Sequence, residues 1–187
     1  MHTATKMKKE TEDKLKVPDG LTVTIKDQSI TVQGKKGEIT RIVGDPLVRM
    51  KLEGHELHIA AEGETKREKT KVGTWKAHVK NMFKGAESGH HYKLKICSGH
   101  FPMNATVSEK EFAVKNFLGE KVPRRVAVRM GVTVKIEGEF VTVESPDKEL
   151  AGQMAADIEE LCKIRGRDTR IFQDGIWITE KDGKTVK

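Results

Sequence analysis

Long apolar runs are missing from this 187-residue sequence. No stretch approaches the roughly 18 consecutive apolar residues that a membrane-spanning helix requires. The opening segment, MHTATKMKKETEDKLK, also lacks the apolar core of a secretory signal. We therefore expect no membrane partner, and the sequence predicts a cytoplasmic protein.

Cysteine is scarce as well. Only Cys97 and Cys162 occur, far apart and without a C-x-x-C motif. Each stands inside an apolar pattern, which favours buried thiols in a reducing compartment over a disulfide.

Aromatic residues make up 5% of the chain, which is few for a surface that stacks single-stranded nucleic acid. Patterns for catalysis and cofactor binding are also lacking. The GKKG segment from Gly34 to Gly37 does not follow the G-x-x-x-x-G-K-[ST] pattern of a nucleotide site. His90, His91 and His100 have no Cys or carboxylate at a recognisable metal-ligand spacing. We predict no catalytic residue, no metal and no cofactor.

Positive charge, in contrast, is abundant. Lys and Arg outnumber Asp and Glu by 35 to 28, giving a formal charge of +7 and a pI near 9.3. This balance favours a polyanionic partner. Charge alone leaves both nucleic acid and an acidic membrane surface open.

The sequence repeats itself. The segment Gly20 to Ile39 aligns with the segment Gly131 to Leu150, and each contains an alternating run, a polar turn and a second alternating run. This pattern is typical of a β-hairpin with one buried face. The residues of the first segment that meet an identical residue in the second are Gly20, Thr22, Val23, Ile25, Thr31, Val32 and Glu38.

A helical pattern follows each hairpin. Apolar residues recur at i, i+4, i+7 and i+8, which places them on one helix face: Trp75, Val79, Met82 and Phe83 in the first copy, Met154, Ile158, Leu161 and Cys162 in the second. A matching glycine, Gly73 or Gly152, is expected just before each helix, and the charged stretch GETKREKTK is expected to be a loop. Asp157, Glu159 and Glu160 fall opposite the second stripe and are expected on a solvated face.

These patterns predict an α+β protein of two tandem homologous domains, each an antiparallel β-sheet with one α-helix packed on it. We expect a flexible basic tail at 1–14, the first domain at 15–86, the second at 87–180 and a short tail at 181–187. No homo-oligomer is expected.

Two basic clusters fall in the second half. The first lies at the loop NFLGEKVPRRV: Lys115 directly precedes the loop, Asn116 begins it, and Lys121, Arg124 and Arg125 stand around Pro123. The second cluster follows the helix and consists of Lys163, Arg165, Arg167 and Arg170. Arg forms a bidentate fork on phosphate and Lys a point charge, so both clusters favour a nucleic acid. Phe172 is expected in the core, whereas Trp177 could either pack inside or stack on a base.

Three stretches, GHFPMN (Gly99 to Asn104), NFLGEK (Asn116 to Lys121) and FQDGIWITEK (Phe172 to Lys181), resemble the sixth protein of the large ribosomal subunit in its archaeal and eukaryotic branch. The resemblance covers roughly residues 14 to 182, with Trp177 where a tyrosine is usual. It implies a structural protein without catalytic activity. Such a protein binds large-subunit (23S-type) rRNA near the stalk base and the loop touched by translational GTPases, chiefly through its second domain, beside neighbouring ribosomal proteins.

The residues of the two basic clusters, with Trp177, are the candidate rRNA contacts. Two other functions remain as alternatives: a small RNA-processing nuclease using His90, His91 and His100, and a free-standing RNA chaperone. The nuclease predicts turnover and metal dependence. The chaperone predicts indiscriminate binding of single strands, which the few aromatic residues disfavour.

Overall fold

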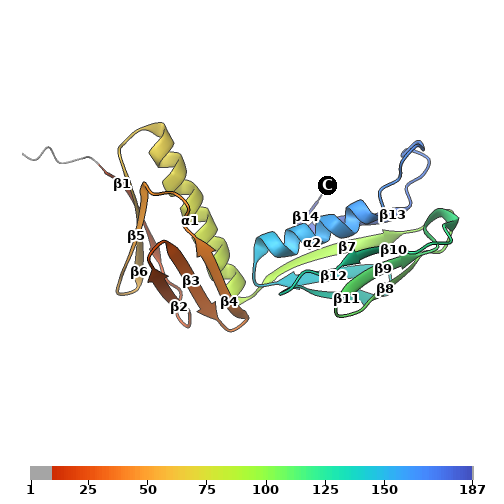
Figure 1. Ribbon diagram of the computed structural model, residues 1–187, viewed down its shortest axis with the longest axis horizontal. Coiled ribbons are helices and arrows are strands. Elements are labelled where there is room, and N and C mark those ends of the chain that lie inside the picture. Colours follow the sequence, from red (N-terminus) through yellow and green to blue (C-terminus); the bar gives the residue numbers. More distant parts are fainter. Residues whose placement is uncertain (1–9, 187) are drawn as a thin grey trace, which may run out of the picture. The chain divides into compact units, whose positions relative to one another are not determined.

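The computed structural model describes residues 10–186, and the chain divides into two compact units, residues 1–88 and 89–187. Each unit combines antiparallel strands with one α-helix (Figure 1). The predicted α+β class and the two homologous domains are confirmed. Each unit in fact divides its strands between two sheets. No helix in the described part of the chain is long and apolar enough to cross a membrane.

The first unit contains two three-stranded sheets and helix α1 (Lys66–Glu87). One sheet has the order β1 (Glu10–Lys16), β6 (Glu56–Glu62), β5 (Val48–Glu53). The other has the order β2 (Thr22–Lys26), β3 (Ser29–Gly34), β4 (Gly37–Ile42). The apolar side of α1, including Val79 and Phe83, packs with inward strand residues such as Ile30, Val32 and Ile59.

Residues 10–14 belong to β1, so the expected tail at 1–14 reaches too far; residues 1–9 lie outside the described part. The stretch is polar in composition, which is typical of a tail, but its polar groups have partners. Thr11 Oγ1 donates to the Gly63 carbonyl at 2.8 Å. Lys76 Nζ on α1 donates to the Asp13 carboxylate at 2.6 Å and 2.7 Å. Hydrogen bonds and ion pairs thus attach a strand that brings little apolar surface.

Helix α1 begins at Lys66, so only Gly63 to Thr65 of the charged stretch expected as a loop precede it, and the rest of that stretch forms its first turn and a half. Lys, Arg and Glu are strong helix formers, and Thr65 with Glu68 has the spacing of a capping box. Gly73 therefore lies inside α1, and Gly152 likewise lies inside α2 (Lys148–Leu161). Neither glycine precedes its helix.

The GKKG turn between β3 and β4 rests against the C-terminal end of α1. The Lys36 amide donates to the Ala86 carbonyl at 3.0 Å, which satisfies one acceptor that the helix end leaves open. A Cβ on Gly34 would lie 2.4 Å from the same oxygen. The close contact between this turn and the end of α1 therefore requires glycine at position 34.

The second unit contains a five-stranded and a three-stranded sheet. The larger has the order β11 (Thr133–Glu137), β12 (Phe140–Ser145), β7 (His90–Cys97), β13 (Gly175–Lys181), β14 (Lys184–Thr185). The smaller has the order β10 (Arg124–Ala127), β9 (Glu111–Lys115), β8 (Asn104–Val107). A short 3-10 turn, η1 (Phe117–Gly119), follows β9.

Helix α2 packs its apolar side on the five-stranded sheet. Asp147 caps its start, with Oδ1 accepting from the Glu149 amide at 2.8 Å. Met154 and Ile158 are fully buried, together with Leu94, Val141 and other inward strand residues. The predicted stripe on this helix is therefore the core-facing side.

The expected tail at 181–187 also contains structure, because β14 pairs with β13 within it. The turn between them is Asp182-Gly183, and both residues have positive φ, 55° and 83°. Asp-Gly is a strong signal for a two-residue hairpin turn, so this hairpin has a local signature in the sequence.

Candidate nucleic-acid interface

Three loops meet at the end of the second unit where β7 finishes: residues 98–103, 116–123 and 162–174. In Figure 1 they lie at the right-hand end of this unit, the last of them in blue. Asn116 has left-handed backbone dihedrals and donates from Nδ2 to the Pro102 carbonyl at 3.0 Å, which joins the first two loops. Its amide is therefore used in holding the loops together.

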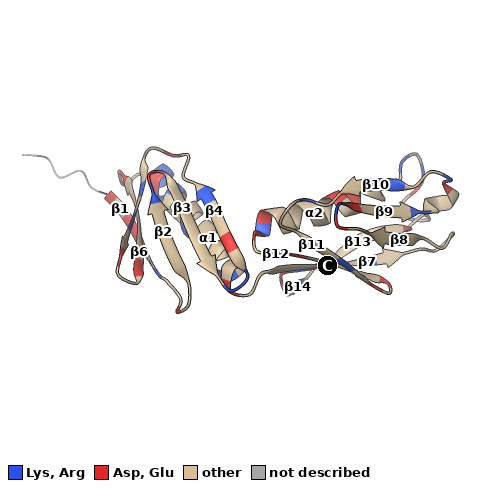
Figure 2. Ribbon diagram, turned by 60° about the horizontal axis from the view of Figure 1, so that its bottom comes forward, with Lys and Arg blue, Asp and Glu red and all other residues tan. Residues whose placement is uncertain are grey.

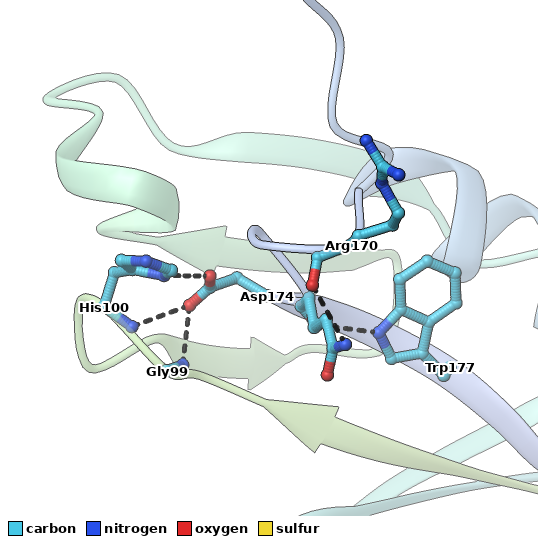
Figure 3. Close-up of polar contacts among 6 residues, drawn as sticks. Gly99, His100, Arg170, Asp174 and Trp177 are labelled. Atoms are coloured by element: carbon cyan, nitrogen blue, oxygen red, sulfur yellow. Dashed lines mark hydrogen bonds and ion pairs between the residues drawn. The ribbon is translucent and has the colours of Figure 1, made fainter. Parts of the chain in front are cut away.

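A buried carboxylate joins the first loop to the third (Figure 3). Asp174 is 2% exposed, and its Oδ1 accepts from the amides of Gly99 at 2.6 Å and His100 at 2.9 Å. Its Oδ2 contacts His100 Nδ1 at 2.5 Å. Burial acts to raise the pKa of Asp174, but the hydrogen bonds from His100 and Gly99 outweigh it and lower the pKa below its usual value. The carboxylate is thus a charged clamp at neutral pH.

Phe172 lies between a cation and an imidazole. Its ring stacks on His100, with centroids 4.6 Å apart and 21° between the planes. The Arg167 guanidinium carbon lies 4.7 Å from the centroid of the same ring. Phe172 is only half-buried, so the prediction that it lies in the core is wrong. One of its contacts is with His100, and Arg167 makes a cation–π contact with the same ring.

Arg124 joins the second loop to the end of α2. Its Nη1 donates to the carbonyl oxygens of Leu161 at 2.8 Å and Lys163 at 3.3 Å. Its Nε and Nη2 donate to the two carboxylate oxygens of Glu120 at 2.8 Å and 2.6 Å. The guanidinium also covers the Phe117 ring at 4.2 Å. This side chain is a structural strut of the loop, and its hydrogen bonds lower the pKa of Glu120.

Three residues of the second predicted basic cluster and Arg124 of the first line one cleft of about 430 Å³ between the second loop and the chain that leaves α2. The charged residues of its lining are two acids, Glu120 and Glu160, and four cations, Arg124, Lys163, Arg165 and Arg167. Lys163, Arg165 and Arg167 are exposed. Figure 2 shows this concentration of blue after α2 and at the start of β10. A cleft of this kind suits a phosphate group.

The other predicted contacts do not line this cleft. Lys115 and Lys121 are exposed at the ends of the second loop. Arg125 faces away on β10 and pairs with Glu111 at 3.3 Å. Arg170 is held by Asp168 at 2.7 Å but remains 88% exposed at the tip of the third loop. These four exposed cations, here called the outer rim, lie outside the cleft.

Trp177 resolves the choice left open by the sequence: it faces outward and is 43% exposed. Its Nε1 donates to the Gln173 carbonyl at 3.1 Å, which fixes the ring (Figure 3). It also borders an apolar cleft of about 400 Å³ with Phe172 and Cys162. Burial raises the pKa of the Cys162 thiol to about 12.

Several acidic and histidine side chains of this unit have structural partners. Asp157 pairs with Arg129 at 2.8 Å, and Glu159 accepts from the Ile178 amide at 3.1 Å, so the expected solvated face is partly engaged. His90 is fully buried against Asp182 at 3.2 Å. Within residues 10–186, no three His, Cys, Asp or Glu side chains are placed to hold a metal ion.

Comparison with known proteins places both units in one family. The family model described as ribosomal protein L6 matches residues 17–89 and 101–175, one match in each unit. The chain belongs to the ribosomal protein L6 family. This confirms the resemblance seen in the three sequence motifs, and it makes the chain a ribosomal protein and not an enzyme.

Archaeal members of the family resemble the chain along nearly its whole length. It is 40% identical to large ribosomal subunit protein uL6 of Methanococcus vannielii over 174 residues, 93% of this chain and 96% of the relative. It is 39% identical to that of Natronomonas pharaonis over 166 residues, 89% and 94%. For Methanothrix thermoacetophila the identity is 37% over 175 residues, 94% and 99%.

Proposed function

We propose that this ribosomal protein L6 family member is a structural constituent of the large ribosomal subunit in the cytoplasm. It binds large-subunit rRNA near the stalk base and the factor-binding loop, next to the ribosomal proteins of that region and within reach of translational GTPases. The observation that carries the proposal is the cleft of about 430 Å³ on which Lys163, Arg165 and Arg167 converge.

The three-loop end of the second unit suits folded RNA because it is fixed before binding. The Asp174 clamp, the Asn116 amide and the Arg124 strut join all three loops through hydrogen bonds of 2.5 Å to 3.3 Å. Rigid loops lose little conformational entropy on association. Arg167 is further held over Phe172. The cations therefore keep a fixed spacing that only a matching arrangement of phosphates satisfies.

The candidate contacts take different roles in this proposal. Lys163, Arg165 and Arg167 bind phosphate in the cleft, and Lys115, Lys121, Arg125 and Arg170 bind it around the rim. Arg124 and Asn116 position the second loop. Trp177 offers an exposed ring to an unpaired base or a sugar. Phosphate contacts position the protein without reading sequence, so specificity comes from the shape of the RNA.

The test is binding of the full chain to an rRNA fragment that contains the factor-binding loop, across a salt series. An unrelated structured RNA of equal length serves as the comparison. The variant Arg165→Ala/Arg167→Ala removes two cleft cations. The variant Arg49→Ala/Arg129→Ala is the matched control, because it removes two arginines that pair with Glu62 and Asp157.

We expect preference for the cognate fragment. The cleft variant should reduce the slope of log affinity against log salt by about two, one unit for each phosphate that the variant no longer binds. The control should change it by clearly less. Equal binding to both RNAs would contradict the proposed place in the ribosome, and equal slopes for the two variants would remove the cleft from the interface.

A further inference from the structure

The first unit carries its own concentration of positive charge. Helix α1 holds seven Lys or Arg residues and two Glu within 22 residues. Lys71 and Lys76 are engaged in ion pairs with Asp45 and Asp13, both at 2.6 Å. Five cations of this helix remain exposed to solvent: Lys66, Arg67, Lys69, Lys80 and Lys84.

Four of the exposed cations share one face. With about 3.6 residues per turn, Lys66, Lys69, Lys80 and Lys84 fall within an arc of roughly 60° on the helix, outside the stripe of buried residues such as Val72 and Val79. They form two lysine pairs, one toward each end of α1. Lys66 and Lys84 are separated by roughly 27 Å along the axis, at 1.5 Å per residue. Within the described residues, Lys66, Lys69 and Lys80 make no ion pair.

The face between the lysine pairs is smooth. Gly73 and Ala77 occupy its centre. Thr70 and Thr74 lie beside them with their hydroxyl groups turned back to the helix, donating to the carbonyls of Lys66 at 2.8 Å and Thr70 at 2.9 Å. No long side chain stands on this part of the face, so another molecule can approach the helix backbone closely.

Gly73 has no packing reason to be glycine. A Cβ at this position would meet nothing within 4 Å. Glycine inside a helix costs about 1 kcal/mol relative to alanine. At the matching position of α2, a Cβ on Gly152 would lie 3.2 Å from the Tyr92 hydroxyl, so packing there explains the glycine. In α1, Gly73 lowers the stability of the helix, and no packing contact within the fold explains the glycine.

We propose that this outer face of α1 docks into the minor groove of an RNA duplex. The minor groove of A-form RNA is wide and shallow, and proteins recognise duplex RNA there through shape, phosphates and 2′-hydroxyls. The smooth centre at Gly73 and Ala77 enters the groove, and the two lysine pairs contact the phosphates on its flanks. The positive charge of the face favours a polyanion as the partner. The two lysine pairs are far enough apart to contact the two phosphate backbones that flank the groove.

The surface belongs to the first unit, so it is tested in a background that lacks two cleft cations of the second unit. The full chain carrying Arg165→Ala/Arg167→Ala is titrated with a blunt RNA duplex of about 16 base pairs, the length a duplex-binding domain spans. A DNA duplex of the same sequence provides the B-form comparison. Affinities are measured across a salt series.

Two variants address the two parts of the surface. Removal of the four lysines (Lys66, Lys69, Lys80 and Lys84, each to Ala) should lower the salt slope by about four. Its matched control changes four exposed lysines on strands of the same unit (Lys14, Lys16, Lys26 and Lys51, each to Ala) and should lower the slope much less. Gly73→Gln should weaken RNA binding roughly tenfold, an energy of about 1.4 kcal/mol, without unfolding the helix, since Gln is a good helix former.

The control for bulk is Gly44→Gln, because a Cβ at Gly44 also meets nothing within 4 Å. It should leave the affinity unchanged. Equal slopes for the two lysine variants, unchanged binding by Gly73→Gln, or equal affinity for the DNA and RNA duplexes would each overturn the proposal. None of these outcomes bears on the second unit, whose cleft is tested with the rRNA fragment.

Discussion

Arg124 reaches from the start of β10 to the last turn of α2, where its Nη1 lies 2.8 Å from the carbonyl oxygen of Leu161. Open carbonyls at a helix end favour a cation. The adjacent Arg125 instead extends into solvent, with 63% of its side chain exposed. Two neighbouring arginines thus have different tasks, one inside the protein and one directed outward.

Arg124→Ala should therefore destabilise the second unit by about 1–2 kcal/mol, since it removes hydrogen bonds from a charged donor that is only partly exposed. Arg125→Ala should change stability by less than about 0.5 kcal/mol. Denaturant unfolding followed by Trp177 fluorescence in a Trp75→Phe background measures this unit alone. Equal effects of the two substitutions would show that Arg124 is not a strut.

Gly34 and Gly73 of the first unit should respond oppositely to alanine. Gly34→Ala places a Cβ 2.4 Å from the Ala86 carbonyl oxygen and should cost about 1–3 kcal/mol. Gly73→Ala should stabilise the unit by up to about 1 kcal/mol. Trp75 fluorescence in a Trp177→Phe background reports both. A neutral Gly34→Ala would mean that the β3–β4 turn does not rest on α1.

The Asp174 clamp makes the loops sensitive to acid. Its pKa is lowered in the folded protein, so its contribution to stability is complete above the unfolded value of about 3.9 and is lost as the pH falls through the folded value. Asp174→Asn should destabilise the second unit at pH 7 and flatten its loss of stability below about pH 4. Stability measured from pH 7 to pH 3 tests this. Parallel curves for the two proteins would contradict it.

The two thiols should differ sharply in reactivity. Cys162 is 2% exposed with a pKa raised to about 12, so it has almost no thiolate at pH 8. Cys97 is half-buried near the end of β7. Alkylation at pH 8 in native buffer should modify Cys97 and leave Cys162 intact until the unit unfolds. Mass spectrometry of the peptides identifies the modified residue, and early labelling of Cys162 would show that the α2 packing opens readily.

Alternation and internal repetition predict much of the fold. Val23 and Ile25 match Val134 and Ile136, and the period of two that they share is a local property that the sequence displays directly. Alternation of apolar residues does not predict strands that are mostly polar. The sequence of β1 is typical of a tail because Asp13 gains its partner from Lys76, 63 residues away, and composition contains no trace of such a pair.

The composition of the candidate interface can be predicted from the sequence, but the contacts that hold its loops together cannot. Both basic clusters are visible as runs of Lys and Arg, yet nothing local distinguishes Arg124, a strut, from Arg125. Sequence reasoning misses Asp174 because its partners lie 74 and 75 residues earlier. One local signal exists. Asp174 directly precedes a strand of alternating isoleucines, and an acid in that position is a candidate for a structural contact of its carboxylate.

In the second unit the first and last long strands are neighbours, because β13 pairs with β7 through the middle of the larger sheet. A ribosome delivers β7 at the start of this unit and β13 near the unit's end, so the unit's central pairing forms only when almost all of its strands have emerged. The first unit has all of its strands and its helix by Ser88. Folding during synthesis is thus expected to proceed in two steps, with the loops of the candidate interface completed only when the last residues arrive.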